Sequence, residues 1–264
     1  MNYPLSDDQL HRFAPSIFAE EPHDSRSSRY QFIPTIRIVN ALRDEGFEPF
    51  SAQQTIVRDK SRVSHSKHLI RMRHNSIQGD LDDTNEIVLI NSHDGSSSYR
   101  IMAGCYRFVC ANGLILGDAF DDVRIRHQGE ETAGLVIEGA YEVLSTFDQV
   151  NEHKEGMKSL KLTDRGAEVF AEAALSLKYD PKGGPAPVTP SQLLFPRHRE
   201  DCSNTVWHIF NRIQESLISG GLRGRSRNGR RTRTRAVNGI DQNVQLNSAL
   251  WSLAEAFRSG NIFE

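Results

Sequence analysis

Apolar side chains recur at helical spacing in five parts of the chain. Pro34 and Thr35 begin the first of these stretches and Gly46 ends it, because proline suits a first turn and glycine a left-handed cap. Thr163 and Asp164 begin another stretch, with the aspartate near the positive end of the helix dipole. The spacing predicts helices over residues 34–46, 132–153, 163–177, 203–219 and 241–257.

Between residues 48 and 128 the periodicity changes to that of strands. Short alternating, β-branched or aromatic segments are separated by polar turns, and the turn at residues 93–98 implies a β-hairpin. In one segment Arg71 and Arg73 share a face while Met72 points to the other, which predicts a sheet with one solvated, partly basic face. The predicted strands are residues 55–58, 69–73, 86–91, 99–110 and 123–127.

Together these elements predict an α+β fold, in which an antiparallel sheet meander with packed helices is followed by a C-terminal helical hairpin. Residues 220–239 form a loop of about 20 residues within that hairpin, whereas roughly 2–8 residues usually join bundled helices. A loop of this length indicates either a binding element or tolerated disorder. We expect an N-terminal arm at 1–33, an α+β core domain at 34–178, a Pro/Gly-rich linker at 179–202 and the hairpin with its basic loop at 203–264.

The composition is typical of a soluble globular protein. Of the 264 residues, 38% are apolar and 25% are charged. No run approaches the roughly 18 apolar residues of a membrane helix, and the N-terminal residues lack the charged and apolar blocks of a signal peptide. We therefore expect a cytoplasmic protein with no membrane partner.

A cluster of seven arginines within residues 223–235 is the strongest chemical feature of the sequence. No acidic residue interrupts this cluster, and glycine, serine and threonine lie between the cations. Because the planar fork of arginine matches phosphate oxygens, the cluster predicts contacts with a phosphodiester chain. The predicted nucleic-acid-binding residues of the cluster are Arg223, Arg225, Arg227, Arg230, Arg231, Arg233 and Arg235.

The rest of the chain is acidic. The formal net charge is −2, and without the seven arginines 25 basic residues stand against 34 acidic ones, a formal charge of −9. A body of this charge does not attract nucleic acid as a whole, so binding has to be local. Two other interpretations stay open: a solvated, disordered loop without a partner, or a loop that docks on an acidic face of its own or a neighbouring subunit.

Basic side chains on the predicted strands extend the nucleic-acid hypothesis. Residues 99–108 combine aromatic rings with Arg100 and Arg107, and basic and aromatic groups together suit a single strand. Alternating charge is also what an ordinary solvated sheet face has. The four arginines predicted to extend the phosphate track across the sheet are Arg71, Arg73, Arg124 and Arg126.

Signals for catalysis and metal binding are weak. His65 and His68 lie three residues apart in a predicted strand region, so they face opposite sides, and His74 adds no convergent ligand. The acidic residues at positions 80, 82, 83 and 86 lack the glycine and ligand spacing of an EF-hand and are expected to form a solvated turn.

Cysteine chemistry and cofactor motifs are similarly thin. Cys105, Cys110 and Cys202 lack the spacing of a disulfide framework or a zinc site, and Cys110 is expected to pack as a small apolar side chain instead of acting as a nucleophile. No nucleophile elbow, Walker loop or Rossmann fingerprint occurs. We expect a protein that is not an enzyme and takes no cofactor or metal.

Several motifs resemble a known family. They lie at residues 108–113 (FVCANG), 124–129 (RIRHQG), 207–215 (WHIFNRIQE), 220–225 (GGLRGR), 233–235 (RTR) with 239–241 (GID), and 246–254 (LNSALWSLA). From about residue 30 to the C-terminus the chain resembles the uncharacterised phage/plasmid-like proteins, a domain-of-unknown-function family. The resemblance implies a mobile genetic element in a bacterial cytoplasm. The order of elements is loosely similar to the core of single-strand annealing recombinases, a likeness that transfers no function by itself.

These observations lead to two hypotheses about function. The first is a non-enzymatic, homo-oligomeric protein that binds nucleic acid, above all single-stranded DNA, during recombination, annealing or replication of a mobile genetic element. The second is an interaction protein that inhibits a host defence or nuclease complex, with the arginine loop displacing a nucleic-acid contact on the host defence protein. Retention of DNA at physiological salt separates the two.

Overall fold

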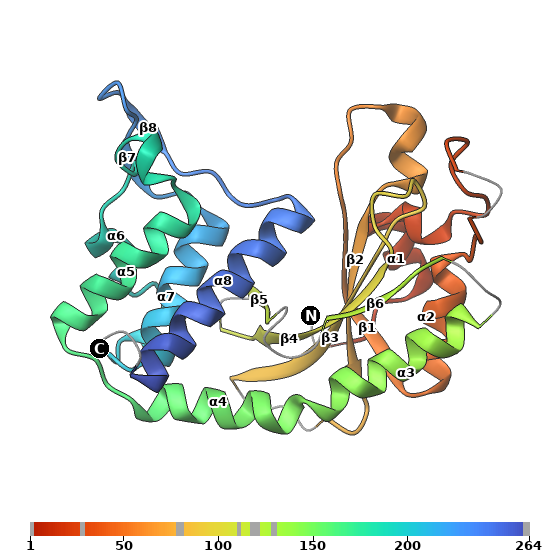
Figure 1. Ribbon diagram of the computed structural model, residues 1–264, viewed down its shortest axis with the longest axis horizontal. Coiled ribbons are helices and arrows are strands. Elements are labelled where there is room, and N and C mark those ends of the chain that lie inside the picture. Colours follow the sequence, from red (N-terminus) through yellow and green to blue (C-terminus); the bar gives the residue numbers. More distant parts are fainter. Residues whose placement is uncertain are drawn as a thin grey trace. The chain divides into compact units, whose positions relative to one another are not determined.

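The computed structural model describes residues 3–26, 30–77, 82–109, 112–116, 122–127 and 131–260. The chain forms two compact units (Figure 1). The predicted α+β class is confirmed, because an antiparallel sheet and helices occur together. No helix in the described residues is both long enough and apolar enough to cross a bilayer. The units comprise Met1–Arg107 with Gly113–Phe147, and Phe108–Asn112 with Asp148–Glu264.

A six-stranded sheet forms the centre of the first unit. Its strands follow the order β1-β2-β3-β4-β5, and β6 pairs with the first half of β4. The predicted hairpin is confirmed, since β3 and β4 pair antiparallel on either side of residues 92–98. The strands are β1 (Phe47–Gln54), β2 (His68–His74), β3 (Asp83–Asn91), β4 (Tyr99–Arg107), β5 (Asn112–Ile115) and β6 (Asp122–Ile125).

Among the described residues, three α-helices and two short 3-10 helices complete the first unit. The helix predicted after Pro34 is confirmed, and Gly46, with a φ of 89°, turns the chain from this helix into β1. Gly139 lets α3 approach the sheet, because a Cβ at this position would lie 2.8 Å from Val123 Cγ1. The helices are α1 (Asp7–Phe13), η1 (Pro15–Phe18), α2 (Thr35–Asp44), η2 (Lys60–His65) and α3 (Thr132–Ser145).

Two predicted elements differ from the structure. The prediction of a strand at residues 55–58 is wrong: the chain pairs earlier, in β1, although that segment contains Pro49 and no β-branched residue. Pairing with β2 and burial of Phe47 outweigh its low strand propensity. The single helix expected over 132–153 is two helices, because the chain departs from the first at Thr146, whose Oγ1 donates a hydrogen bond of 2.7 Å to the Val143 carbonyl.

The prediction of a solvated, basic sheet face is also wrong at β2. Residues His68–Met72 of this strand are all buried. Arg71 and Arg73 both bind the buried carboxylate of Glu86, with closest N–O distances of 3.3 Å and 2.8 Å. Arg71 also donates a hydrogen bond of 3.1 Å to the Leu114 carbonyl, and the Arg73 guanidinium lies 4.1 Å from the centre of the Phe50 ring. The two arginines therefore balance an internal carboxylate, a role that a period-two pattern does not reveal.

A chain of hydrogen bonds links three histidines inside the first unit. Thr35 Oγ1 lies 3.0 Å from His68 Nε2 and 2.9 Å from His93 Nε2. The Asn91 side-chain amide donates a hydrogen bond of 3.0 Å to Thr35 Oγ1, and Asn91 Oδ1 lies 2.8 Å from His127 Nε2. The first residue of α2 thus joins polar groups from β2, β3 and the residues that follow β6.

Burial keeps these three histidines neutral. His68 and His93 have no exposed surface and His127 is 7% exposed. Desolvation lowers the pKa of His68 to about 4, that of His93 to about 2 and that of His127 to about 4. Nδ1 of His93 and Nδ1 of His127 have no hydrogen-bond partner among the described residues. The network is therefore incompatible with added protons.

Helices dominate the second unit. Thr163, predicted to begin a helix, caps α5 by accepting a hydrogen bond from the Gly166 amide. Thr205 caps α7 by accepting one from the His208 amide, so this helix begins at Val206 and not at residue 203. Phe170 of α5 stacks on Phe257 of α8 at 4.7 Å. The helices are α4 (Phe147–Ser159), α5 (Asp164–Lys178), η4 (Pro181–Gly183), α6 (Pro190–Leu194), η5 (Arg199–Asp201), α7 (Val206–Ser219) and α8 (Ile240–Ser259).

The division of the chain differs from the expected domains. The units separate at Phe147, whereas the sequence suggested a core domain up to residue 178. Helix α5 contacts α6, α7 and α8, so it belongs with the C-terminal helices. Residues 179–202, expected to link two domains, instead connect elements of one unit.

Candidate nucleic-acid interface

Residues 223–233 form a β-hairpin between α7 and α8. Strand β7 (Arg223–Arg225) pairs antiparallel with β8 (Arg231–Arg233), so the long loop expected here has regular structure (Figure 1). Ser226 and Arg230 close the turn through a backbone hydrogen bond of 2.9 Å, and Gly229 supplies the positive φ of 71° that the turn requires. The arginines are thus carried by a paired backbone.

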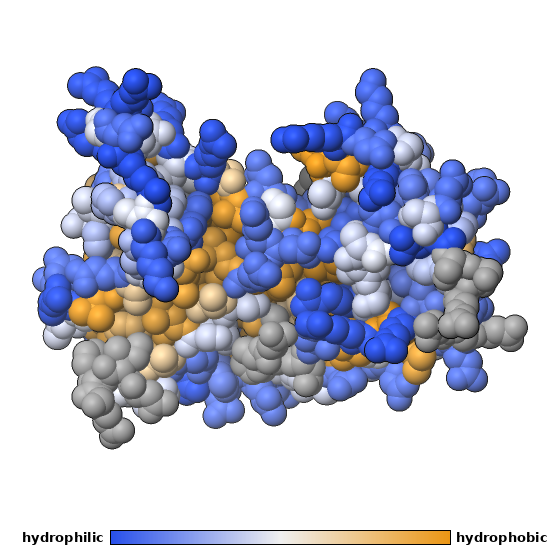
Figure 2. All heavy atoms as spheres, turned by 45° about the horizontal axis from the view of Figure 1, so that its top comes forward, coloured by the Kyte–Doolittle hydropathy of each residue, from blue (hydrophilic) through white to orange (hydrophobic). Residues whose placement is uncertain are grey.

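The strand register places four arginines on one face of the hairpin. Arg223 is opposite Arg233, and Arg225 is opposite Arg231. Side chains that are directly opposite, or two residues apart along a strand, share a face. All four are exposed, and Figure 2 shows strongly hydrophilic side chains over the projecting hairpin, at the upper left as in Figure 1.

These four guanidinium groups face solvent without a counter-charge. Within the described residues, no carboxylate pairs with any of the four. Arg225 Nη1 donates a hydrogen bond of 3.1 Å to the Gly229 carbonyl, which carries no formal charge. Like charges directly opposite one another in a sheet are destabilising. The hairpin therefore has an electrostatic cost that an anionic ligand would offset.

The opposite face of the hairpin rests on the segment that joins α5 to α6, and α6 adds a further contact. The Arg225 amide donates a hydrogen bond of 2.9 Å to the Pro187 carbonyl, and Gln192 Nε2 donates one of 2.8 Å to the Arg223 carbonyl. Gly224 faces this segment closely: a Cβ added there would lie 1.9 Å from the Pro187 oxygen. Only glycine fits at this contact, and the contact fixes which face of the hairpin points outward.

Replacing Gly224 by alanine is expected to detach the hairpin without changing its charge. The added methyl clashes with a backbone carbonyl that cannot withdraw without breaking its bond to Arg225, and overpacking of this kind costs about 1–3 kcal/mol. Thermal unfolding and limited proteolysis of the hairpin measure the effect. Gly134→Ala is the control, because a Cβ at Gly134 of α3 meets nothing within 4 Å. Equal protease resistance of Gly224→Ala and the wild type would contradict this docking.

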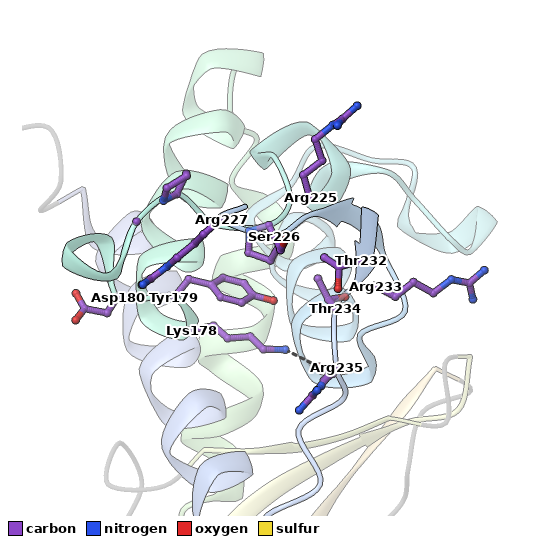
Figure 3. Close-up of a pocket in the computed structure, with 13 residues that line it drawn as sticks. Lys178, Tyr179, Asp180, Arg225, Ser226, Arg227, Thr232, Arg233, Thr234 and Arg235 are labelled. Carbon is purple, nitrogen blue, oxygen red and sulfur yellow. Dashed lines mark hydrogen bonds between the residues drawn. The ribbon is translucent and has the colours of Figure 1, made fainter. Parts of the chain in front are cut away.

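A pocket of about 470 Å³ lies beside the hairpin, at the C-terminal end of α5 (Figure 3). The half-buried ring of Tyr179 lines it, together with Pro185 and Pro187. Lys178 Nζ lies 5.7 Å from the centre of the Tyr179 ring and donates 3.0 Å to the Arg235 carbonyl and a second hydrogen bond to the Leu217 carbonyl. Partial burial lowers the pKa of Lys178.

The rim of this pocket is cationic. Arg225, Arg227, Arg233 and Arg235 all line it, and Figure 3 shows Arg225 and Arg233 pointing away from its centre. Arg227 lies over η4, where glycines 183 and 184 leave room for it: a Cβ on Gly183 would be 2.2 Å from Arg227 Nη2. Asp180 is the sole acid among the described residues of the lining, and its carboxylate caps η4 by accepting from the Lys182 amide.

The remaining predicted site residues do not join the hairpin's unit. Arg124 is exposed but binds Asp122, which also binds Arg100, while Arg126 is exposed and has no carboxylate partner in the described residues. Tyr99, expected on a stacking surface, is fully buried. Lys178 and Tyr179 were not among the predicted site residues, because an aromatic residue before a Pro/Gly-rich segment is a weak signal in a sequence.

Other chemical candidates do not converge. His65 contacts the Glu21 carbonyl and His74 contacts the Glu45 carbonyl, while His68 lies in the core. Over the described ranges, no three His, Cys, Asp or Glu side chains are arranged to hold a metal ion. Asp80 and Cys110 lie outside the described residues.

Comparison with known proteins identifies the family. A family model described as "Domain of unknown function (DUF932)" matches residues 22–251, which include the hairpin and the pocket. The chain belongs to the DUF932 family. Two proteins from Escherichia coli K12 are similar to this chain over most of its length. UPF0380 protein YafZ is 49% identical over 254 residues, which cover 96% of this chain and 91% of YafZ. UPF0380 protein YfjQ is 49% identical over 253 residues, with the same coverage of both chains. No solved structure matches.

Proposed function

We propose that this protein binds nucleic acid through the outward face of the β7–β8 hairpin, with single-stranded DNA as its principal ligand. The main support is the in-register set of Arg223, Arg225, Arg231 and Arg233, exposed and without a carboxylate partner in the part of the chain that the structure describes. Each guanidinium can present two parallel N–H donors to a phosphate. A phosphodiester chain laid along the hairpin would offset the repulsion among the four cations.

The charge distribution favours a local contact with this face. The seven arginines of residues 223–235 are all exposed, whereas the rest of the chain has a formal charge of −9. Because the rest of the chain is acidic overall, attraction for phosphate is concentrated at the hairpin, so the ligand meets the protein in a defined place. Arg227, Arg230 and Arg235 continue the positive surface around the turn and past β8.

The biological setting of this proposal follows the resemblance to phage/plasmid-like proteins. We place the activity in the bacterial cytoplasm, in recombination, annealing or replication of a mobile genetic element. The loose similarity to single-strand annealing recombinases motivates a homo-oligomeric state, which light scattering of the protein with and without DNA measures.

Replacing the four in-register arginines by glutamine is expected to weaken binding of single-stranded DNA at least about a hundred-fold, because hydrogen bonds to charged groups contribute about 1.5–3 kcal/mol each. The log–log salt slope should become shallower by about 0.7 for each phosphate that the variant no longer neutralises. Fluorescence anisotropy with a labelled oligonucleotide at several salt concentrations measures both quantities.

A matched control removes the same charge elsewhere. Arg12, Arg37, Arg58 and Arg62 are exposed in the first unit, and their fourfold glutamine variant should bind nearly as the wild type does. If the two variants lose affinity equally, binding depends on net charge and the proposal is wrong. If the wild type retains no DNA near physiological salt, a protein partner such as a host defence complex becomes the better hypothesis.

A further inference from the structure

We infer that the pocket beside the hairpin holds an unpaired nucleobase, stacked on Tyr179 while the adjoining arginines bind the flanking phosphates. This inference rests on the proposed function and adds what part of the nucleic acid the site reads. Tyr179 is positioned by α5, whose last turn ends one residue earlier, and its amide donates 2.8 Å to the Leu175 carbonyl. The ring is therefore attached to a helix end instead of a free loop.

The lining of the pocket has the two kinds of chemistry that a nucleotide presents. Tyr179, Pro185 and Pro187 supply aromatic and apolar wall, and Arg225 and Arg227 supply cations at the rim. Single strands are bound elsewhere by this same combination of a cationic track with aromatic rings on which bases stack. The volume of about 470 Å³ lies within the roughly 300–1,000 Å³ range of ligand pockets.

Lys178 gives the pocket a fixed geometry. Its ammonium group donates hydrogen bonds to two carbonyl groups, that of Leu217 in α7 and that of Arg235 after β8, so it ties α5 to α7 and to the residues that follow the hairpin. These bonds occupy donors that a phosphate would otherwise take, while the positive charge remains in the pocket. We therefore assign Lys178 to positioning the pocket and the arginines to the phosphates.

Paired bases do not fit this arrangement. In a duplex both faces of each base are covered by its neighbours, so a ring can stack on Tyr179 only where a base is unpaired or has left the stack. Sequence preference should be small, because every base has a flat face. The pocket therefore predicts discrimination between single and double strands, which phosphate contacts by themselves do not supply.

Binding of a short oligothymidylate and of an abasic strand of equal length tests the inference. Wild-type protein should prefer the oligothymidylate by about five-fold to a hundred-fold, the range that stacking of one base provides. Tyr179→Leu keeps apolar bulk without a π face and should abolish this preference, whereas Tyr179→Phe keeps the ring and should retain it. All three proteins should have the same salt slope, since no arginine is changed.

The possible results separate this inference from the proposed function. If the glutamine variant of the hairpin loses binding while Tyr179→Leu prefers oligothymidylate as the wild type does, the base subsite is wrong and the hairpin interface stands. If neither strand binds, both are wrong. Free thymidine monophosphate that binds as tightly as the strand would also overturn the inference, by showing a mononucleotide site. Unchanged thermal unfolding of both Tyr179 variants verifies that the fold is intact.

Discussion

Acidification from pH 6.5 to 4.5 is expected to destabilise this protein by several kcal/mol, because three buried histidines in the first unit resist protonation. In the unfolded chain a histidine binds a proton near pH 6.5. In the folded chain His68, His93 and His127 stay neutral to about pH 4 or below. The unfolded state therefore takes up more protons throughout this interval.

The sign and the size of the effect follow from proton linkage. A group whose pKa is lower in the folded state, and whose neutral form is the buried one, favours unfolding once the pH falls below its unfolded pKa. Each such histidine contributes a slope of about 1.4 kcal/mol per pH unit, so three give up to about 4 kcal/mol per unit. Asp59, Asp94 and Asp122 also have lowered pKa values, but they lose their contribution only below about pH 4, outside this window.

Urea denaturation at a series of pH values measures this dependence. His68→Gln supplies a matched variant, since its amide can still hydrogen-bond to Ser16 or Thr35 but does not titrate. Whatever its stability at pH 7, the free energy of unfolding of this variant should change less steeply with pH, by the contribution of one proton, about 1.4 kcal/mol per pH unit. A wild-type free energy of unfolding that stays constant between pH 6.5 and 4.5 would contradict the neutral state of the network.

Glu86→Gln is expected to cost about 3–5 kcal/mol of stability at pH 7, the effect of removing one partner from a buried ion pair. The carboxylate of Glu86 is 1% exposed and binds both Arg71 and Arg73, whose side chains are 9% and 12% exposed. Arg71 cannot move to water easily, because its guanidinium lies against Gly113, where a Cβ would be 2.2 Å from Arg71 Cζ. The variant removes from the interior the negative charge that both arginines bind.

An ion pair in the same sheet whose arginine is exposed provides the comparison. Arg124 binds Asp122 but has a side chain that is 60% exposed, so Arg124→Gln should cost no more than about 1 kcal/mol. Asp122 keeps its second partner, Arg100, in that variant. Both free energies of unfolding come from urea titrations at pH 7. If the two substitutions cost the same, neutralisation by Glu86 does not stabilise the interior and the prediction is wrong.

The β-hairpin of residues 223–233 could have been predicted from the alternation of its residues, which is independent of its charge. Arginine alternates with a small residue over residues 223–227 and again over 231–235, and Asn228-Gly229 lies between the two runs. Period-two alternation on both sides of Asn-Gly is a strong hairpin signal. The number of glycines and the charge density indicated a loop instead, because glycine disfavours strands unless close packing requires it, as Pro187 does at Gly224.

By itself the sequence determined the helical periodicity, the α+β class, the β3–β4 hairpin and the concentration of positive charge in residues 223–235, because these depend on local spacing and composition. Only the tertiary structure decided which cations are free. Arg71 and Arg73 meet Glu86 across neighbouring strands, while the hairpin arginines point to solvent, a difference set by strand register and not by neighbours in the chain. The Tyr179 pocket likewise required α5 and the hairpin, about 50 residues apart in sequence, to be brought together by packing.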